Sequence, residues 1–137
     1  MEIFGFSVLT LAKLLVTAFN GILFTQSGLD KVFHYQGNLD YFKEHFKKSP
    51  LAPTVGLLMP VITFLETSAG LISLSGTLLI LLGSSWGLTI SAYGLSIGGI
   101  SITCLFFGQR MAQDYAGAAG LVPYFLMTML GIILHAF

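Results

Sequence analysis

Four long apolar stretches, separated by shorter polar segments, define the pattern of this chain. They run from about residue 4 to 28, 57 to 82, 88 to 107 and 117 to 135. A bilayer core of about 30 Å needs roughly 20 apolar residues per helix, so each stretch is long enough to cross it. None shows the period-two alternation of a barrel strand. The pattern predicts an all-α membrane protein, a single antiparallel bundle of four transmembrane helices.

The polar segment at residues 30–53 has a pattern of its own and holds seven of the twelve charged residues. With Asn38 as an N-cap, Leu39, Phe42 and Phe46 fall on one helical face and the charges fall elsewhere. This pattern predicts a short amphipathic helix lying in the membrane interface. A lid over the mouth of the bundle is the alternative.

Composition supports a membrane protein. Hydrophobic residues make up 55% of the 137, and charged residues only 9%, against roughly 25% in an average soluble domain. Twelve charges with a net charge of zero exclude an ordinary soluble enzyme and a nucleic-acid binder. The lone Cys104 excludes dithiol chemistry within the chain. All the basic residues outside the spans lie in the first and third loops, which predicts cytoplasmic loops.

Lys13, Asn20 and Glu66 are the polar residues most out of place within the apolar stretches. A charge at mid-bilayer costs about 2.5–3.5 kcal/mol and so needs a partner or a function. Counting 1.5 Å per residue from the expected helix ends places Lys13 and Glu66 each roughly 14 Å deep. They are therefore candidates for an ion pair. With Asn20 they form a candidate ligand-binding site, the alternative being packing seams with one buried pair.

Small residues in the third stretch predict close helix packing. The face that they form comprises Gly87, Ser91, Gly94, Gly98 and Ser101.

A second polar group is expected at the loop end of the bundle. Arg110 and Asp114 are spaced to pair on one helical turn, and Asp30 is a second candidate partner for Arg110. The group either fixes the loops or binds a lipid headgroup or a partner protein. Its members are Ser27, Asp30, Lys31, Gln109, Arg110 and Asp114.

No catalytic residue and no metal site are predicted. The three histidines are divided, with His34 and His45 at the loop end and His135 at the other. The chain has no zinc-ligand spacing, no phosphate-binding glycine loop and no hydrolase motif.

Three segments carry a family resemblance: FTQSGLDK at residues 24–31, FLETSAG at 64–70 and FGQRMAQDYAGAA at 107–119. Together they resemble the DoxX family of small four-helix membrane proteins, along essentially the whole chain. The resemblance implies a left-handed antiparallel bundle in a bacterial inner membrane and an accessory link to membrane redox systems. The positions that match the family's polar pattern are Ser27, Lys31 and Glu66, and no catalytic role comes with them.

The expected function is that of a non-catalytic membrane subunit that organises or anchors a larger envelope or redox complex. Its partners would be the lipid bilayer and other membrane proteins or further copies of itself. A quinone- or lipid-binding subunit is the alternative, with Lys13, Asn20 and Glu66 holding the polar head and no other cofactor. A small transporter is a weaker alternative, because four helices leave little room for a pathway.

Overall fold

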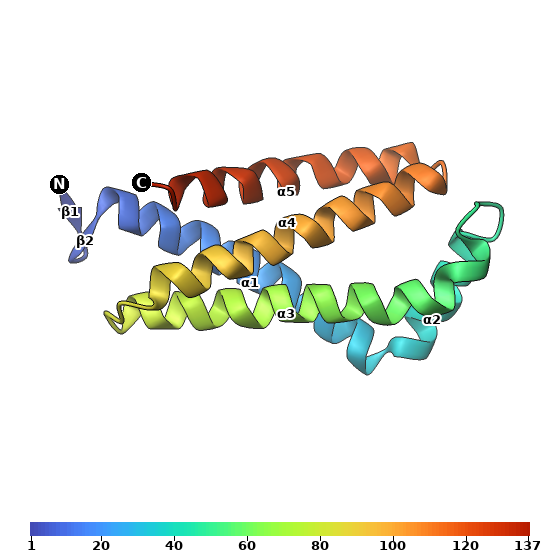
Figure 1. The fold of residues 1–137 in the computed structure, drawn as a ribbon, viewed down its shortest axis with the longest axis horizontal. Helices are drawn as coiled ribbons and strands as arrows, with labels where there is room; N and C mark the ends of the chain where they lie inside the picture. Colours follow the sequence, from blue (N-terminus) through green and yellow to red (C-terminus); the bar gives the residue numbers. More distant parts are fainter.

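The computed structural model describes residues 1–137 and is helical apart from one short hairpin (Figure 1). Four helices are long and apolar enough to cross a membrane, which confirms the four expected stretches. In chain order the elements are β1 Glu2–Ile3, β2 Phe6–Ser7, α1 Val8–Phe33, α2 Tyr35–His45, the 3₁₀ helix η1 Ala52–Thr54, α3 Val55–Leu81, α4 Gly87–Met111 and α5 Tyr115–Leu134.

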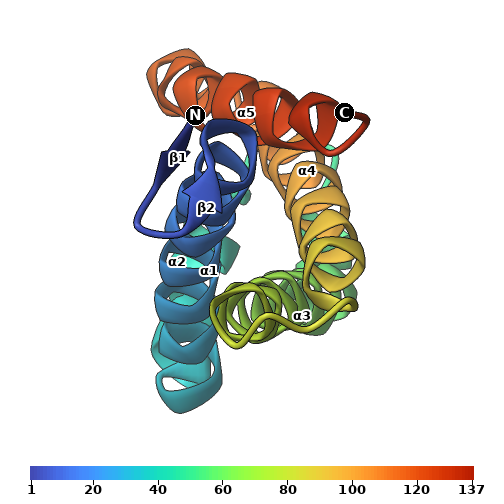
Figure 2. The same ribbon diagram turned by 90° about the vertical axis from the view of Figure 1, so that its left-hand side faces the viewer.

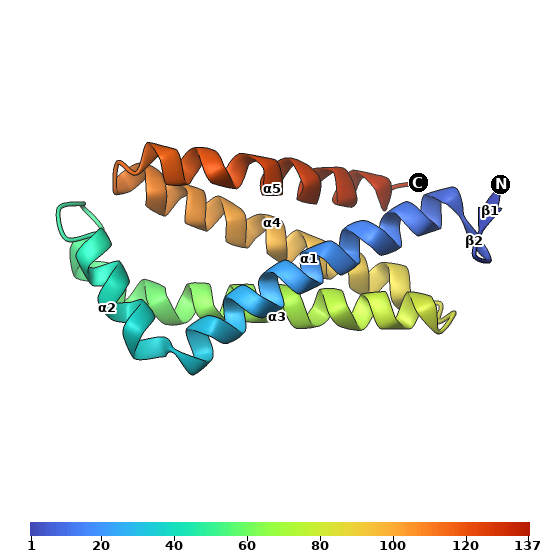
Figure 3. The same ribbon diagram turned by 180° about the vertical axis from the view of Figure 1, so that it is seen from behind.

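The four long helices are arranged in a ring when viewed along their length (Figure 2). α1 packs on α3, α3 on α4, and α4 on α5, while α5 makes far fewer contacts with α1. α1 crosses α3 obliquely, so one of its ends lies close to α5 and the other projects past α3 toward α2 (Figure 3). α2 lies at the end of the bundle where α1 ends and α3 begins.

The first helix begins later than the sequence predicts. Residues 2–7 form the hairpin of β1 and β2 instead of the first helical turn, with Phe4 and Gly5 at positive φ in the turn. Ser7 then caps α1, its hydroxyl accepting the Thr10 backbone N–H at 3.1 Å. The apolar run from Phe4 predicts a helix there, but a tight turn built from Phe4 and Gly5 does not interrupt the apolar run, so hydropathy cannot distinguish the hairpin from a helical turn.

The other helix ends differ by a few residues from the expected ones. α1 continues past residue 28 to Phe33, and α2 begins at Tyr35 with His34 as its cap, not at Asn38. The predicted break between the second and third stretches is present. Gly83 adopts a positive φ there, a conformation that glycine tolerates without strain.

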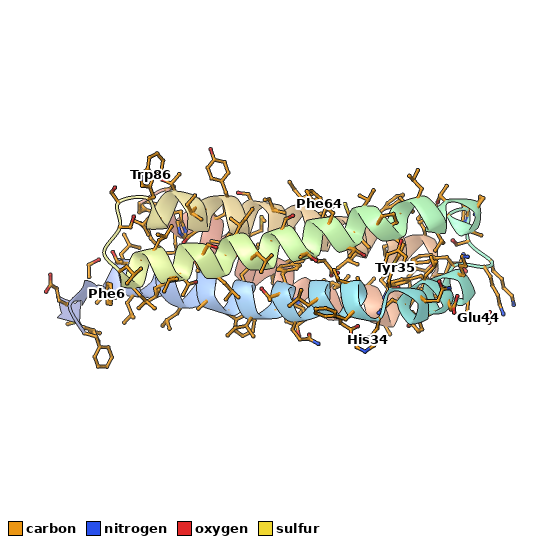
Figure 4. All side chains as sticks on the ribbon, turned by 90° about the horizontal axis from the view of Figure 1, so that it is seen from below. Phe6, His34, Tyr35, Glu44, Phe64 and Trp86 are labelled. Carbon is orange, nitrogen blue, oxygen red and sulfur yellow. The ribbon has the colours of Figure 1, made fainter.

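The bundle has a polar interior and an apolar exterior. Nine hydrophobic and ten polar or charged side chains are buried, whereas large apolar side chains cover the outside. Phe64, in the first half of α3, is 71% exposed, and Trp86 is 68% exposed near one end of the bundle (Figure 4). In water this surface would be unfavourable, but against lipid tails it is the expected one.

Small residues bring the helix backbones together. A Cβ on Gly28 would lie 2.6 Å from the Thr67 backbone nitrogen, and one on Gly94 would lie 2.8 Å from that of Ser73. The face predicted for the third stretch is buried at all five positions, namely Gly87, Ser91, Gly94, Gly98 and Ser101. These glycines serve packing within the bundle, so they do not offer a surface to a partner.

Candidate functional site

The three candidate polar residues of α1 lie at separate levels of the helix. Lys13, Asn20 and Lys31 are all buried. At 1.5 Å per residue, Asn20 lies about 10 Å along the helix from Lys13 and about 16 Å from Lys31. The candidate site of Lys13, Asn20 and Glu66 is therefore divided, because Glu66 contacts the level of Lys31.

The Glu66 cluster consists of Ser27, Lys31 and Glu66. Lys31 Nζ lies 2.7 Å from Glu66 Oε2 and donates a hydrogen bond of 3.1 Å to Ser27 Oγ. Ser27 Oγ donates in turn to Glu66 Oε1 at 3.1 Å. The Glu66 side chain is only 2% exposed, and Oε2 has the charge of Lys31 beside it but no well-directed hydrogen bond. The cluster is a closed, internally neutralised triad.

The expected pair of Lys13 and Glu66 is wrong, and the helix register explains why. Thr67 lies against Gly28, Gly70 against Thr25, and Leu74 against Gly21. Each step forward along α1 therefore moves the contact one step back along α3. Glu66 consequently lies between the levels of Ser27 and Lys31.

The Asn20 cluster lies at the centre of the bundle. Asn20 Nδ2 donates to Ser73 Oγ on α3 at 2.9 Å, and Thr128 Oγ1 on α5 lies 3.5 Å from Asn20 Oδ1. Gly98 of α4 packs against the same amide. Asn20 therefore contacts the other three long helices. Its amide joins these helices by hydrogen bonds and packing, and it is not free to bind a ligand.

Lys13 has no partner. It is 6% exposed, it makes no ion pair, and its ammonium donates no hydrogen bond within the chain. Its backbone carbonyl accepts a hydrogen bond from the Thr17 hydroxyl at 2.7 Å. This bond lies within α1 and does not neutralise the Lys13 ammonium.

His135 lies just past the end of α5, at the same end of the bundle as Lys13. Its Nδ1 donates to the Gly131 carbonyl at 2.7 Å, and its Nε2 is buried without a partner. Burial lowers the pKa of the imidazole below its ordinary value of 6.5, and the Lys13 charge lowers it further. The hydrogen bond to Gly131 acts in the opposite direction. The neutral ring therefore presents a free acceptor nitrogen.

His135 should make the fold sensitive to acid. Because the folded-state pKa is lowered, the unfolded chain binds more protons between that pKa and 6.5, so the free energy of unfolding rises with pH across this window. We expect the melting temperature in detergent to fall between about pH 7.5 and about pH 5, and His135→Asn, which keeps a donor for Gly131, to reduce this fall. An equal fall in both proteins would contradict the assignment, because all other titrating groups are shared.

The loop-end group is also divided. Arg110 pairs with neither Asp114 nor Asp30, but lies over the Tyr115 ring, 4.4 Å from its centroid. Asp114 caps α5 by accepting the Gly117 N–H at 2.9 Å. Asp30 lies near His34, at 3.4 Å, and accepts a long hydrogen bond from Asn38.

His45 is a further member of this group, and the residue spacing did not indicate it. His45 Nε2 lies 2.7 Å from Gln109 Oε1 and 3.7 Å from Asp114 Oδ2. The next residue, Phe46, packs against Gly108. Leu39, Phe42 and Phe46 are half-buried, as the amphipathic pattern predicts. The end of α2 is thus held to the last turn of α4 and to Asp114 just beyond it. The aromatic residues around His45 were the signal for this contact in the sequence.

Two surface cavities lie away from the Glu66 and Asn20 clusters. One, of about 260 Å³, lies between α4 and α5 and has an almost wholly apolar lining that includes Phe106 and Phe125. The other, of about 380 Å³, lies beside the first half of α4, and His135 forms part of its wall. No three histidine, cysteine or acidic side chains gather closely enough to hold a metal ion. Cys104 is exposed on α4.

These features define a helical protein with one short hairpin, four helices of membrane-spanning length and apolarity, an interior with about equal numbers of polar and apolar side chains, and an apolar surface. No protein-family model, curated protein or solved structure is detectably similar to the chain. The family resemblance therefore stays a prediction.

Proposed function

We propose that the chain is a non-catalytic integral-membrane subunit that helps to assemble or anchor a larger envelope complex in a bacterial inner membrane. In this proposal the long helices cross the membrane in alternating directions, and α2 lies in the interface. Four helices of sufficient length and an apolar outer surface support the placement.

The observation that carries the proposal is that contacts within the chain close the Glu66 and Asn20 clusters. Glu66 is neutralised by Lys31 and bonded by Ser27, and Asn20 is bonded by Ser73. Groups engaged in this way hold the helices together, which is a structural and not a chemical role. The contact among the three residues that match the DoxX polar pattern is consistent with an accessory role of that kind. A redox complex is the partner that this resemblance favours.

α5 offers the surface most open to a partner. Only 17% of the residues in its apolar segment are buried, against 28 to 39% in the other three long helices. Ala116 and Gly120 are exposed on it, one helical turn apart, and a Cβ on Gly120 would meet nothing within 4 Å. Small residues spaced in this way allow a second transmembrane helix to approach closely.

The proposal predicts association through α5. Purified in a mild detergent, the protein should migrate as an assembly larger than the 14.8 kDa monomer, with itself or with other membrane proteins. Gly120→Leu should weaken this association while the fold persists, as judged by circular dichroism. Gly56→Leu is the matched control, because Gly56 is equally open but lies on α3. A wild-type protein that is strictly monomeric and purifies alone would overturn the proposal.

A quinone headgroup held jointly by Lys13, Asn20 and Glu66 is not proposed. The three residues occupy separate levels, and Asn20 and Glu66 are bonded to other side chains. No observation favours a transport pathway over the subunit role.

A further inference from the structure

The Lys13 side chain is mostly buried, at 6% exposed, although its ammonium is not fully enclosed, and the chain provides no counter-charge for it. Lys31 is paired with Glu66, and the exposed Lys47 with Glu44, but Lys13 forms no ion pair. Glu2, the acidic residue nearest in sequence, is exposed in the hairpin and also unpaired. A charge withdrawn from water without a partner is costly, so a group from outside the chain is expected to neutralise it.

The packing of α5 on α1 brings His135 to the level of Lys13. A Cβ on Gly131 would lie 3.1 Å from the Val16 side chain, so these two residues face each other. The two helices run in opposite directions (Figure 1). His135 lies one turn after Gly131 on α5, and Lys13 lies nearly one turn before Val16 on α1, so both residues lie at the same level of the bundle. The pair therefore combines an unpaired ammonium with the buried, unpartnered Nε2 of His135.

We propose that Lys13 and His135 form a binding site for the headgroup of an anionic phospholipid that carries a free hydroxyl, such as phosphatidylglycerol. A phosphate oxygen accepts from the Lys13 ammonium, and a headgroup hydroxyl donates to His135 Nε2. Both orphan groups are satisfied in this way, and the charge of Lys13 is neutralised.

The position of the site suits a lipid headgroup. Lys13 lies five residues, about 8 Å, from the start of α1, which is near the membrane boundary and not at the midplane. Trp86, a residue type enriched at that boundary, marks the same end of the bundle (Figure 4). The cavity that His135 helps to line also has Thr89 and Tyr93 in its wall. The apolar outer surface beside it can accept the acyl chains.

The test is a comparison of lipid retention and stabilisation. Wild-type protein is reconstituted in vesicles of phosphatidylcholine with or without phosphatidylglycerol and re-extracted in mild detergent, and its bound lipid is measured by mass spectrometry. We expect selective retention of phosphatidylglycerol and a higher melting temperature with it. Lys13→Met should weaken binding about tenfold or more, because a hydrogen bond to a charged group is lost.

Two variants isolate the contributions of the ammonium and of Nε2. Lys13→Arg keeps the charge and should retain the lipid. His135→Asn keeps the donor to Gly131 but removes Nε2, and should weaken the selectivity for phosphatidylglycerol. These two variants still test the proposal if Lys13→Met fails to fold. Lys48→Met, at an exposed lysine at the other end, is the charge-matched control and should bind as the wild type does.

Three results would overturn the proposal. Equal retention of phosphatidylglycerol by Lys13→Met and the wild type would show that Lys13 does not bind it. An equal loss in Lys48→Met would show that retention reflects overall charge. Stabilisation by inorganic phosphate that matches stabilisation by the lipid would show that the site takes a free anion. Each result leaves the proposed association through α5 untouched, because that association is measured separately.

Discussion

Lys31→Met is expected to lower the free energy of unfolding by about 3–5 kcal/mol, the usual cost of removing one partner from a buried ion pair. The Glu66 carboxylate, 2% exposed, would then keep only the Ser27 hydroxyl as a partner. The methionine keeps most of the volume and the apolar stem of lysine, so the loss reflects charge and not packing. Equilibrium unfolding in mixed detergent micelles, followed by circular dichroism, measures it.

A double substitution shows whether the lost stability comes from the unpaired Glu66 charge or from the change at residue 31 itself. Replacing both residues, as Lys31→Met with Glu66→Leu, should recover most of the lost stability, because apolar groups can substitute for a buried pair at little cost. Lys48→Met, at an exposed lysine, should leave the stability unchanged. If the double variant is as unstable as Lys31→Met alone, the destabilisation does not come from an unpaired Glu66 charge.

The helices could be predicted from the sequence because hydropathy and length are local properties. Each long apolar stretch became a helix of membrane-spanning length, and the break near Gly83 was visible as a glycine and polar cluster. The hairpin at Phe4 and Gly5 could not be found in the same way. Its turn residues interrupt no apolar run, so the first stretch was extended through them.

The members of the candidate site were easier to predict than their partners. Lys13, Asn20 and Glu66 were selected correctly as buried polar residues, because charge and amide groups are rare in apolar helices. The pairing of Glu66 was predicted wrongly, because depths counted from assumed helix ends do not give the register of one helix against another. The register is fixed by close contacts such as Gly28 with Thr67. Aligning the glycines of α1 and α3 against small residues would have placed Glu66 opposite Ser27 and Lys31.

The predicted ion pair between Arg110 and Asp114 is absent for a different reason. Spacing of i and i+4 allows a pair only if both residues lie within one helix, but Asp114 lies beyond the end of α4, as the cap of α5. Gln113 adopts a positive φ in the turn between the two helices, and the Asp114 carboxylate caps α5 instead of pairing with Arg110. A turn of this kind depends on tertiary packing, which the sequence pattern alone does not reveal.

Gly70→Ala tests directly whether glycine contacts set the register of α1 on α3. A Cβ at residue 70 would lie well under 3.0 Å from the Thr25 backbone nitrogen, and backbone cannot move aside as the end of a flexible side chain can. The helices would have to separate, which would also lengthen the contact between Lys31 and Glu66. We expect a loss of about 1–3 kcal/mol in the free energy of unfolding, the range of an overpacked core, measured in the same micelles.

Gly56→Ala is the matched control for this substitution. Residue 56 is also a glycine within a long helix, it lies outside the proposed association surface, and a Cβ there meets nothing within 4 Å. Alanine favours a helix over glycine by about 0.8–1.0 kcal/mol, so this variant should be as stable as the wild type or slightly more stable. The same intrinsic gain applies at residue 70, so a measured loss there understates the cost of separating the helices. Gly70→Ala with unchanged or increased stability would mean that α1 and α3 are not held in register by this contact, and the explanation for the pairing of Glu66 with Lys31 would fail with it.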